Sequence, residues 1–517
     1  MGLNLNFREK TSLNIVTNIV RTLAMALVGV LMVPYYIGTL GITSYAIIPL
    51  ATTMSTYIQL ITECVAYSAE RYTVLAFNSG NIDEANKTIS TSFFGLGKLY
   101  LIFLPIGLFL AFISPNIFAV ANDSLDVQLL FMMIIVSSMA VTLSIPFNGV
   151  FFSSNNLYLL YFAKFAYTIS QVMIIIILFT FSTPSLIIIG LGYIVSSIIM
   201  FILLYCMAKH LEGRMHISRN LYDRELFKKI GSLGFWSTVT NIGNLLYIQL
   251  SLVLVNLSLG SESQGEFALI VTVVSMMNTA VFTITDSTDP LFFKCYSDSN
   301  NEGLVNVLKT GMKMITITFA FPAAFIIAFS KEFLGAWVGG SFEGLSALLT
   351  IGILGNMAFC TMSIAKNIPK VFLKVRIPAL LTLGLGIANA IITIAILNSG
   401  YASAEAAMTV WAISTLLLAI FNSIYVAYLT ASPLYKYITQ ISYGYIIIAI
   451  LMPLLNALKN LIKIPPRWGP LLILLGTLFI AYWILTYMLL YSRKEKELLT
   501  EMLPSRISKH LPKRSIR

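Results

Sequence analysis

The sequence predicts an all-α polytopic membrane protein with about fourteen transmembrane helices, on the evidence of its composition and its recurring apolar runs. Of the 517 residues, 57% are hydrophobic and only 11% are charged, which leaves too little polar surface to cover soluble domains. Apolar runs of roughly 20 residues, the length that a helix needs to cross the hydrocarbon core, recur along the chain. Because water is absent there, such runs form helices, whereas a barrel would show short alternating segments.

The predicted spans are separated by short connections. They cover residues 12–37, 43–67, 90–113, 126–152, 157–181, 184–208, 230–258, 266–290, 310–330, 345–365, 377–398, 405–431, 438–458 and 469–491. The first run is too long for the apolar core of a cleavable signal peptide and lacks a small-residue cleavage site, so we expect it to be a span.

The basic residues predict that both ends of the chain lie in the cytoplasm. With the N-terminus inside, most of the 33 lysine and arginine residues fall on cytoplasmic connections, six of them on the connection 209–229. The exceptions are Lys331, Lys459, Lys463 and Arg467 outside, and Arg21, Lys98 and Lys164 within spans. This is the positive-inside pattern. The formal charge of +11 therefore indicates membrane topology, and no nucleic-acid partner is expected.

The sequence contains no motif that is typical of an enzyme or a metal site. The four cysteines form no CxxC pair, and the three histidines fall in cytoplasmic segments, so neither a disulfide scaffold nor a zinc site is indicated. There is no phosphate loop and no nucleophile elbow. We therefore expect no catalysis, no cofactor and no bound metal.

An internal repeat divides the chain into two lobes. The phrase Val-Thr-Asn-Ile occurs at 16–19 and again at 239–242, and Pro105 and Pro322 precede similar phrases in spans three and nine. Matching helices of the same orientation predict a pseudo-two-fold axis along the membrane normal, as in transporters with a central cavity. The predicted parts are an N-terminal lobe 1–208, a basic cytoplasmic linker 209–229, a C-terminal lobe 230–432, a helix pair 433–492 and a basic cytoplasmic tail 493–517.

Four short phrases connect the chain with a known family. They are PYYIGTLG at 34–41, SYA at 44–46, GIANA at 386–390 and NSGY at 398–401. With these phrases and its six-plus-six-plus-two spans, the chain resembles the Wzx-like oligosaccharide flippases of the MOP superfamily over essentially its whole length. The family often has a basic residue where this chain has Gly38, so the resemblance supplies no basic contact at that outer rim.

The resemblance implies a function. It implies that two lobes alternate in access around an undecaprenyl-diphosphate-linked oligosaccharide, and that the protein moves this lipid across the inner (cytoplasmic) membrane for O-antigen-type polysaccharide, as in lipopolysaccharide synthesis. The partners would be that lipid, the bilayer, and polymerase and chain-length proteins of the same pathway.

One face of the first span carries the candidate substrate site. Asn14, Asn18 and Arg21 recur at helical spacing on that face. By helical rise, Arg21 lies about 13 Å into the core, where a charge requires a polar cavity or a carboxylate. Its planar guanidinium suits bidentate binding of a phosphate. The alternative is a permanent ion pair of Arg21 with Glu63 or Asp286.

Three further residues are candidates for the same cavity. Lys98 either points inward and adds charge for a diphosphate, or extends its ammonium to the headgroups. Asn241 and Asn244 in the seventh span line the cavity according to the repeat, or else join helices through amide hydrogen bonds.

The acidic residues of the spans are candidates for ion coupling. Glu63, Asp286 and Asp289 lie in the cytoplasmic thirds of spans two and eight. Buried carboxylates can bind a proton or a cation during a transport cycle. The alternative is that they pair with Arg21 or Lys98, or that they are solvated at the interface.

The same carboxylates permit a second function. A cation-coupled multidrug exporter of the related MATE type would use Glu63 and Asp286 to hold cationic drugs. Arg21 and the helix pair 433–492 favour the lipid-linked substrate instead, since in lipid-exporting relatives that pair forms a groove for the polyprenyl tail.

Overall fold

The computed structural model describes residues 7–119, 124–462 and 465–496, and none of these residues forms a strand. Twelve helical stretches in this part are long and apolar enough to cross a membrane. One of them, Gly234–Thr285, contains two of the predicted spans, and α2 (Ile42–Asn78) covers a span outside the twelve. Helices therefore occupy all the predicted ranges, which confirms the predicted fold class.

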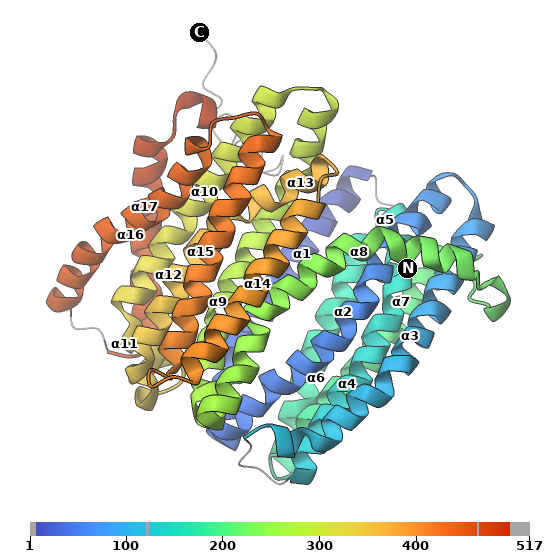
Figure 1. Cartoon of the computed structure of the whole chain (residues 1–517), viewed down its shortest axis with the longest axis horizontal. Helices are drawn as coiled ribbons and strands as arrows, with labels where there is room; N and C mark the ends of the chain where they lie inside the picture. The colour runs from blue at the N-terminus through green and yellow to red at the C-terminus, as the bar shows by residue number, and fades with distance from the viewer. Residues whose placement is uncertain (1–6, 120–123, 463–464, 497–517) are drawn as a thin grey trace. The chain divides into compact units, whose positions relative to one another are not determined.

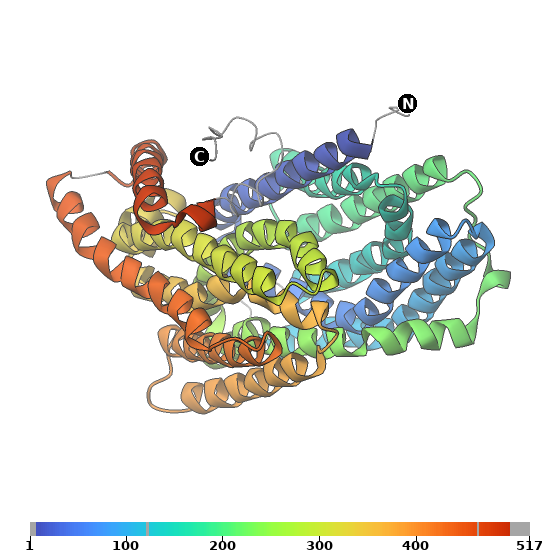
Figure 2. The same ribbon diagram turned by 90° about the horizontal axis from the view of Figure 1, so that it is seen from above.

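The first of two compact units comprises the chain up to Leu269 together with Gly386–Ala404. Its elements are α1 (Phe7–Leu40), α2, α3 (Ile82–Ile117), α4 (Ser124–Ser144), η1 (Ile145–Phe147), α5 (Asn148–Ser153), α6 (Leu157–Phe181), α7 (Leu186–Leu211), η2 (Arg219–Leu221), α8 (Arg224–Tyr247) and the start of α9 (Gln249–Ser297). Within this unit, α2, α3 and α4 pack against one another, α7 packs on α4 and α6, and α1 packs on α6 (Figure 1; Figure 2).

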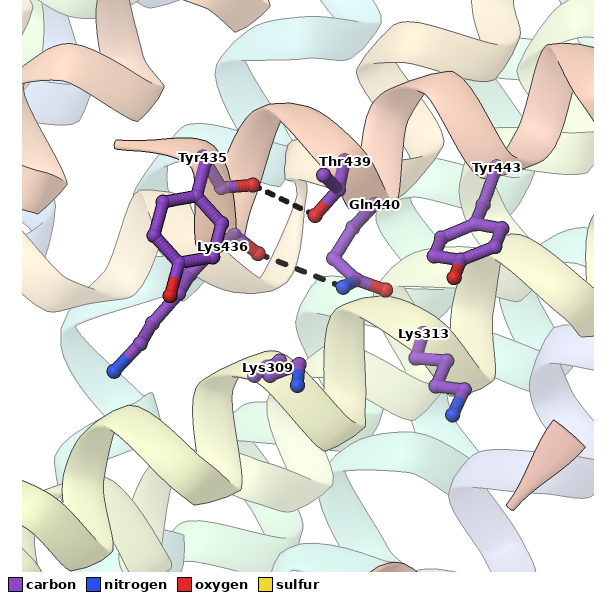
Figure 3. Close-up of a pocket in the computed structure, with 7 residues that line it drawn as sticks. All are labelled: Lys309, Lys313, Tyr435, Lys436, Thr439, Gln440 and Tyr443. Carbon is purple, nitrogen blue, oxygen red and sulfur yellow. Dashed lines mark hydrogen bonds between the residues drawn. The ribbon is translucent and has the colours of Figure 1, made fainter. Parts of the chain in front are cut away.

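The second compact unit comprises Ile270–Leu385 and the chain from Glu405 onward. Its elements are the rest of α9, then α10 (Asn301–Ala328), α11 (Ser330–Trp337), η3 (Gly340–Leu345), α12 (Ser346–Met362), η4 (Ile364–Asn367), α13 (Ile368–Val371), part of α14 (Arg376–Leu397), α15 (Ala404–Leu429), α16 (Tyr435–Leu461) and α17 (Trp468–Leu490). In this unit α10 packs against α12 and α16, and a pocket lies between α10 and α16 (Figure 3). The lobe boundaries predicted from the repeat stay a prediction.

Two connections differ from their predicted form. The seventh predicted span, 230–258, is divided between α8 and α9 at Ile248. The outside connection predicted after it is reduced to a break at Gly260, whose φ of 88° and ψ of 178° interrupt the helical geometry inside α9. Glycine has no Cβ and adopts this positive φ without the usual clash. The predicted outside connection after residue 330 instead contains α11, a further short helix.

Three helices that follow polar connections begin at side-chain caps. Asn81 accepts a hydrogen bond from the backbone N–H of Glu84 at the start of α3, and Asn300 accepts one from Gly303 at the start of α10. Asp223 caps α8. Such caps satisfy backbone donors that have no partner within the helix. Each of these three residues therefore marks the boundary between a polar connection and the helix that follows it.

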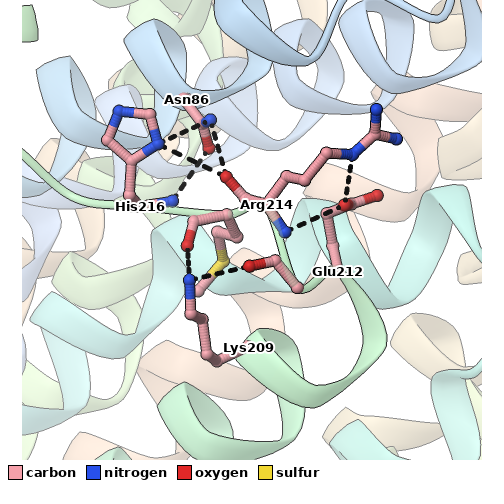
Figure 4. A network of polar contacts seen from close by, with 7 residues as sticks. Asn86, Lys209, Glu212, Arg214 and His216 are labelled. Atoms are coloured by element: carbon pink, nitrogen blue, oxygen red, sulfur yellow. Dashed lines mark hydrogen bonds and ion pairs between the residues drawn. The ribbon is translucent and has the colours of Figure 1, made fainter.

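The basic linker is folded against α3 (Figure 4). Asn86 of α3 donates to the carbonyl of Arg214 at 3.1 Å and accepts from the backbone N–H of His216 at 3.1 Å. Lys209 donates to the carbonyl of Met215, and Arg214 forms an ion pair with Glu212 at 3.3 Å. The middle of the predicted linker, residues 212–223, is therefore an ordered strap over one helix of the first unit, while its two ends belong to α7 and α8.

The same strap continues toward α8 along α3. Ser90 accepts from the backbone N–H of Ser218 at 3.2 Å, and Thr91 accepts from that of Asp223 at 3.1 Å. Lys87 reaches the Asp223 carboxylate at 2.7 Å. The hydrogen bond from Lys87, with that from the backbone of α8, lowers the pKa of Asp223 and keeps the cap ionised.

Candidate functional site: a charged cluster on α1, α2 and α6

The three predicted residues of α1 do not share one role. Arg21 donates from Nε and Nη2 to Asn18 Oδ1 at 3.3 and 3.2 Å, one turn earlier on the same helix. Its guanidinium lies 5.7 Å from the ring centre of Tyr161 on α6, within the range of a cation–π contact. None of the described carboxylates forms an ion pair with Arg21.

Asn14, unlike Arg21, forms hydrogen bonds to residues outside its own helix. Its Nδ2 donates to the backbone carbonyl and the side-chain oxygen of Asn155, at 3.3 and 2.9 Å, and its Oδ1 accepts from the backbone N–H of Tyr158 at 2.7 Å. Only 6% of Asn14 is exposed. The observed contacts of Asn14 thus join α1 to the turn between α5 and α6, and its predicted contact with substrate stays a prediction.

A second cation and a carboxylate belong to the same part of the first unit. Lys164 of α6 lies within electrostatic range of Arg21, which repels it, and of Glu70 on α2, which attracts it. Asn148 of α5 hydrogen-bonds to Glu70. We refer to Arg21, Lys164 and Glu70 as the charged cluster.

The charged cluster has the composition of an anion site. Two cations and one carboxylate leave one net positive charge, and all three groups are half-buried. Charges that are taken out of water need partners of opposite sign. An anion with several oxygens, such as a phosphate or diphosphate, satisfies a guanidinium and an ammonium together.

The other predicted residues have separate environments. Lys98 is exposed and its ammonium lies 3.6 Å from the ring centre of Tyr222 in the linker, so in this structure it packs on the strap. Asn241 is half-buried and Asn244 is exposed, both on α8. Their predicted contacts with substrate stay predictions. The side chains of Glu63, Asp286 and Asp289 lie outside the part of the chain that the structure describes, and so does the tail from residue 497.

The sequence interpretation missed Glu70 and underestimated Lys164. Glu70 lies just beyond the predicted end of span two, and α2 continues to Asn78, so it is half-buried although no apolar run surrounds it. Lys164 was noted only as a basic residue within a span. Its electrostatic interaction with a carboxylate from another helix depends on tertiary packing. The sequence signals it only through a lysine within a span.

A separate basic group belongs to the second unit. Lys366, in η4 just past α12, places its ammonium 3.5 Å from the ring centre of Phe359. Burial lowers the pKa of Lys366 to about 7, while nearby Cys360 raises it and Lys370 lowers it further. Its amine therefore changes charge close to neutral pH, unlike an ordinary lysine.

The fold is similar to those of solved MOP-superfamily transporters. A solved structure of the lipid II flippase MurJ, in an inward closed conformation, matches with a TM-score of 0.69 at 12% identity, covering 92% of this chain and 100% of that one. An inward-facing multidrug resistance MATE family transporter of the MOP superfamily matches with a TM-score of 0.58 at 13% identity, covering 83% of this chain and 97% of that one.

One curated protein is related along nearly the whole sequence. The uncharacterized membrane protein EpsK of Bacillus subtilis (strain 168) is 24% identical over 494 residues, which cover 95% of this chain and 97% of that protein. No protein-family model matches the chain. Together with the apolar helices, this similarity supports a multi-pass membrane protein.

Proposed function

We propose that this protein is a flippase that moves a polyprenyl-diphosphate-linked oligosaccharide from the cytoplasmic to the outer leaflet by alternating access, for the synthesis of a cell-surface polysaccharide of the O-antigen type. The protein would act in the cytoplasmic membrane with both ends in the cytoplasm, as the basic residues predict. Polymerase and chain-length proteins would use the lipid that it delivers.

The charged cluster is the observation that carries this proposal. Arg21 and Lys164 together exceed the charge of Glu70. The one guanidinium nitrogen of Arg21 that does not bind Asn18, Nη1, contacts the Met25 sulfur at 3.5 Å, a weak acceptor that a phosphate oxygen can replace. A cationic drug would be repelled by this excess of positive charge. A diphosphate would be attracted, and the guanidinium geometry favours two oxygens of one phosphate.

The pattern of structural similarity supports a lipid-linked substrate. The MurJ structure covers 92% of this chain and the MATE structure 83%. The wider coverage is what we expect if α16 and α17 have counterparts in a protein that moves a lipid. In this proposal those helices accommodate the polyprenyl tail while the first unit holds the diphosphate.

The membrane potential can bias such a cycle. Moving one elementary charge across the membrane changes its free energy by about 2.3 kcal/mol per 100 mV. The predicted ion-coupling residues Glu63, Asp286 and Asp289 would add a second bias if one of them carries a proton or a cation outward or inward with each turnover.

The proposal is tested by direct binding. The purified full-length protein is titrated with undecaprenyl-diphosphate-linked oligosaccharide and, separately, with a panel of cationic drugs. We expect the lipid-linked sugar to bind and Arg21→Ala to weaken it by about tenfold or more, because a charge-assisted bidentate contact contributes roughly 1.5 to 3 kcal/mol. Arg71→Ala, which removes an exposed arginine from the adjacent helix α2, is the matched control and should bind normally.

The alternative function has its own signature. Drug binding without lipid-linked binding, abolished by Glu63→Gln or Asp286→Asn, would replace the flippase proposal with a MATE-type exporter. If wild type and Arg21→Ala are equally stable and bind the lipid-linked sugar equally well, the charged cluster does not bind the substrate.

A further inference from the structure

The second unit holds a basic pocket that is separate from the charged cluster. It is a cavity of about 210 Å³ between the first turns of α16 and the first half of α10. Lys309 and Lys313 line it from α10, and Lys436 and Gln440 line it from α16 (Figure 3). No acidic side chain is among its lining residues.

Two of its three lysines have no counter-charge among the residues that the structure describes. Lys313 forms an ion pair with Glu495 at 3.0 Å and donates to the carbonyl of Leu490 at 2.6 Å. Neither Lys309 nor Lys436 forms an ion pair with a described carboxylate. The pocket therefore keeps two positive charges after Glu495 has been counted, and an anion is its natural ligand.

Gln440 adds a second requirement. Only 2% of this residue is exposed, and its Oε1 has no hydrogen-bond partner among the described residues, while its Nε2 donates to the carbonyl of Lys436 at 3.5 Å. In Figure 3 its amide extends from α16 toward α10. A buried acceptor without a donor is costly. A phosphate oxygen only accepts, so the ligand must also carry a donor such as a hydroxyl.

The position of the pocket along the membrane normal indicates that such a ligand is a lipid headgroup. Lys309 and Lys436 lie close to the N-terminal ends of two candidate spans, Asn301–Ala328 and Tyr435–Leu461, which is where lipid headgroups meet a spanning helix. Tyr435 is 65% exposed and Tyr443 45% exposed beside the pocket, as is typical of aromatic residues at the membrane interface. Basic pockets between spanning helices bind anionic headgroups.

We propose that this pocket binds the headgroup of an anionic glycerophospholipid that carries free hydroxyls, with Lys309 and Lys436 on the phosphate and Gln440 accepting from a hydroxyl. Phosphatidylglycerol has this chemistry. Because α16 and α10 both contribute, a bound lipid fastens the N-terminal end of α16 to α10. The site uses no residue of the charged cluster, so it does not depend on the proposed transport function.

The test measures lipid binding to the purified full-length protein in detergent by native mass spectrometry. Phosphatidylglycerol is titrated against phosphatidylcholine, and the variants are Lys309→Gln/Lys436→Gln and the matched control Lys370→Gln/Lys374→Gln, which removes two exposed lysines of the same unit. We expect wild type and control to prefer phosphatidylglycerol, and the pocket variant to lose about thirtyfold in affinity, at roughly 1 kcal/mol for each of the two basic residues that it lacks near the headgroups. Equal loss in both variants, or no preference between the lipids, would overturn the proposal.

Two competition experiments distinguish a lipid headgroup from a free phosphate and from the proposed transport substrate. Soluble glycerol phosphate in large excess should not displace the lipid, and undecaprenyl-diphosphate-linked oligosaccharide should not displace it at concentrations that saturate the charged cluster. Displacement by either would assign the pocket to a free phosphate or to the transport substrate instead. Gln440→Leu should weaken phosphatidylglycerol but not phosphatidate, which has no headgroup hydroxyl beyond its phosphate; equal effects on both would exclude the hydroxyl contact.

Discussion

The side-chain oxygen of Asn14 lies 2.7 Å from the backbone nitrogen of Tyr158, the second residue of α6. This N–H belongs to the first turn of the helix, where backbone donors have no partner within the helix. Asn14 therefore caps a neighbouring helix from α1, and at the same time its amide nitrogen donates to Asn155. The contact fixes the N-terminal part of α1 against the start of α6.

Asn14→Ala should destabilise the protein without removing a charge from the site. The substitution removes the acceptor of the Tyr158 N–H and the amide donor to Asn155, which costs about 1 to 3 kcal/mol. The apparent unfolding temperature in detergent should fall by several degrees. Asn244→Ala, at an exposed position of α8, is the control and should leave that temperature unchanged. A stable Asn14→Ala protein with weakened substrate binding would favour the predicted substrate contact.

A glycine in α3 allows α8 to pack closely. A Cβ on Gly95 would overlap the Phe227 ring, whereas one on Gly97 would meet only Leu143 Cδ2 at an ordinary 3.7 Å. Gly95→Ala should therefore lower stability by about 1 to 3 kcal/mol through overpacking. Gly97→Ala should be neutral or stabilising, since alanine favours a helix over glycine by up to about 1 kcal/mol. Thermal unfolding of both variants measures these changes in stability. The double variant Gly95→Ala/Phe227→Ala should recover part of the stability that Gly95→Ala loses.

The charged cluster predicts opposite effects of two neutralising substitutions. Glu70→Gln removes the carboxylate that offsets Lys164, so binding of the diphosphate-linked substrate should tighten by several-fold. Lys164→Met removes a cation and should weaken binding by a similar factor. Titration of both variants at low and moderate salt measures this. Changes of the same sign in the two variants would show that their charges do not act on the ligand.

Lys366 should titrate close to neutral pH. Because burial lowers its pKa from 10.5 to about 7, the rate of acylation by an amine-selective reagent should reach half its maximum near pH 7, as followed by mass spectrometry. The folded state prefers the uncharged amine, so this residue adds stability as pH rises from about 7 toward 10.5. Lys366→Met should therefore stabilise the protein more at pH 6 than at pH 9. A labelling rate that still rises above pH 9 would contradict the shift.

The fold was largely predictable because lipid imposes a strong pattern on sequence. Predicted span 157–181 coincides with α6, and 377–398 and 469–491 differ from α14 and α17 by one residue at each end. The errors occur where the chain leaves the hydrocarbon core. At one such place the expected connection is only a kink at Gly260, which has a positive φ. At another, α11 forms where only a loop was expected.

The candidate site was predictable only in part, because residues on different helices become neighbours through packing. Helical spacing correctly placed Asn18 and Arg21 within reach of each other. It gave no information about Glu70, which meets Lys164 from another helix, or about Tyr161 beside Arg21. Lys98 was unresolved from sequence because its neighbour Tyr222 belongs to a connection whose path periodicity does not predict.

The strap over α3 is held largely through its main chain, with side-chain contacts at His216, Tyr222 and Asp223. Asn86, Ser90 and Thr91 bind backbone N–H and carbonyl groups of residues 214–223 and few of their side chains. Many substitutions in the strap would therefore leave its route unchanged, whereas a proline at His216 or Ser218 would remove a needed donor. The route of the strap is thus set by three short polar side chains on one helix, and most of its own side chains can differ in charge and size without changing that route.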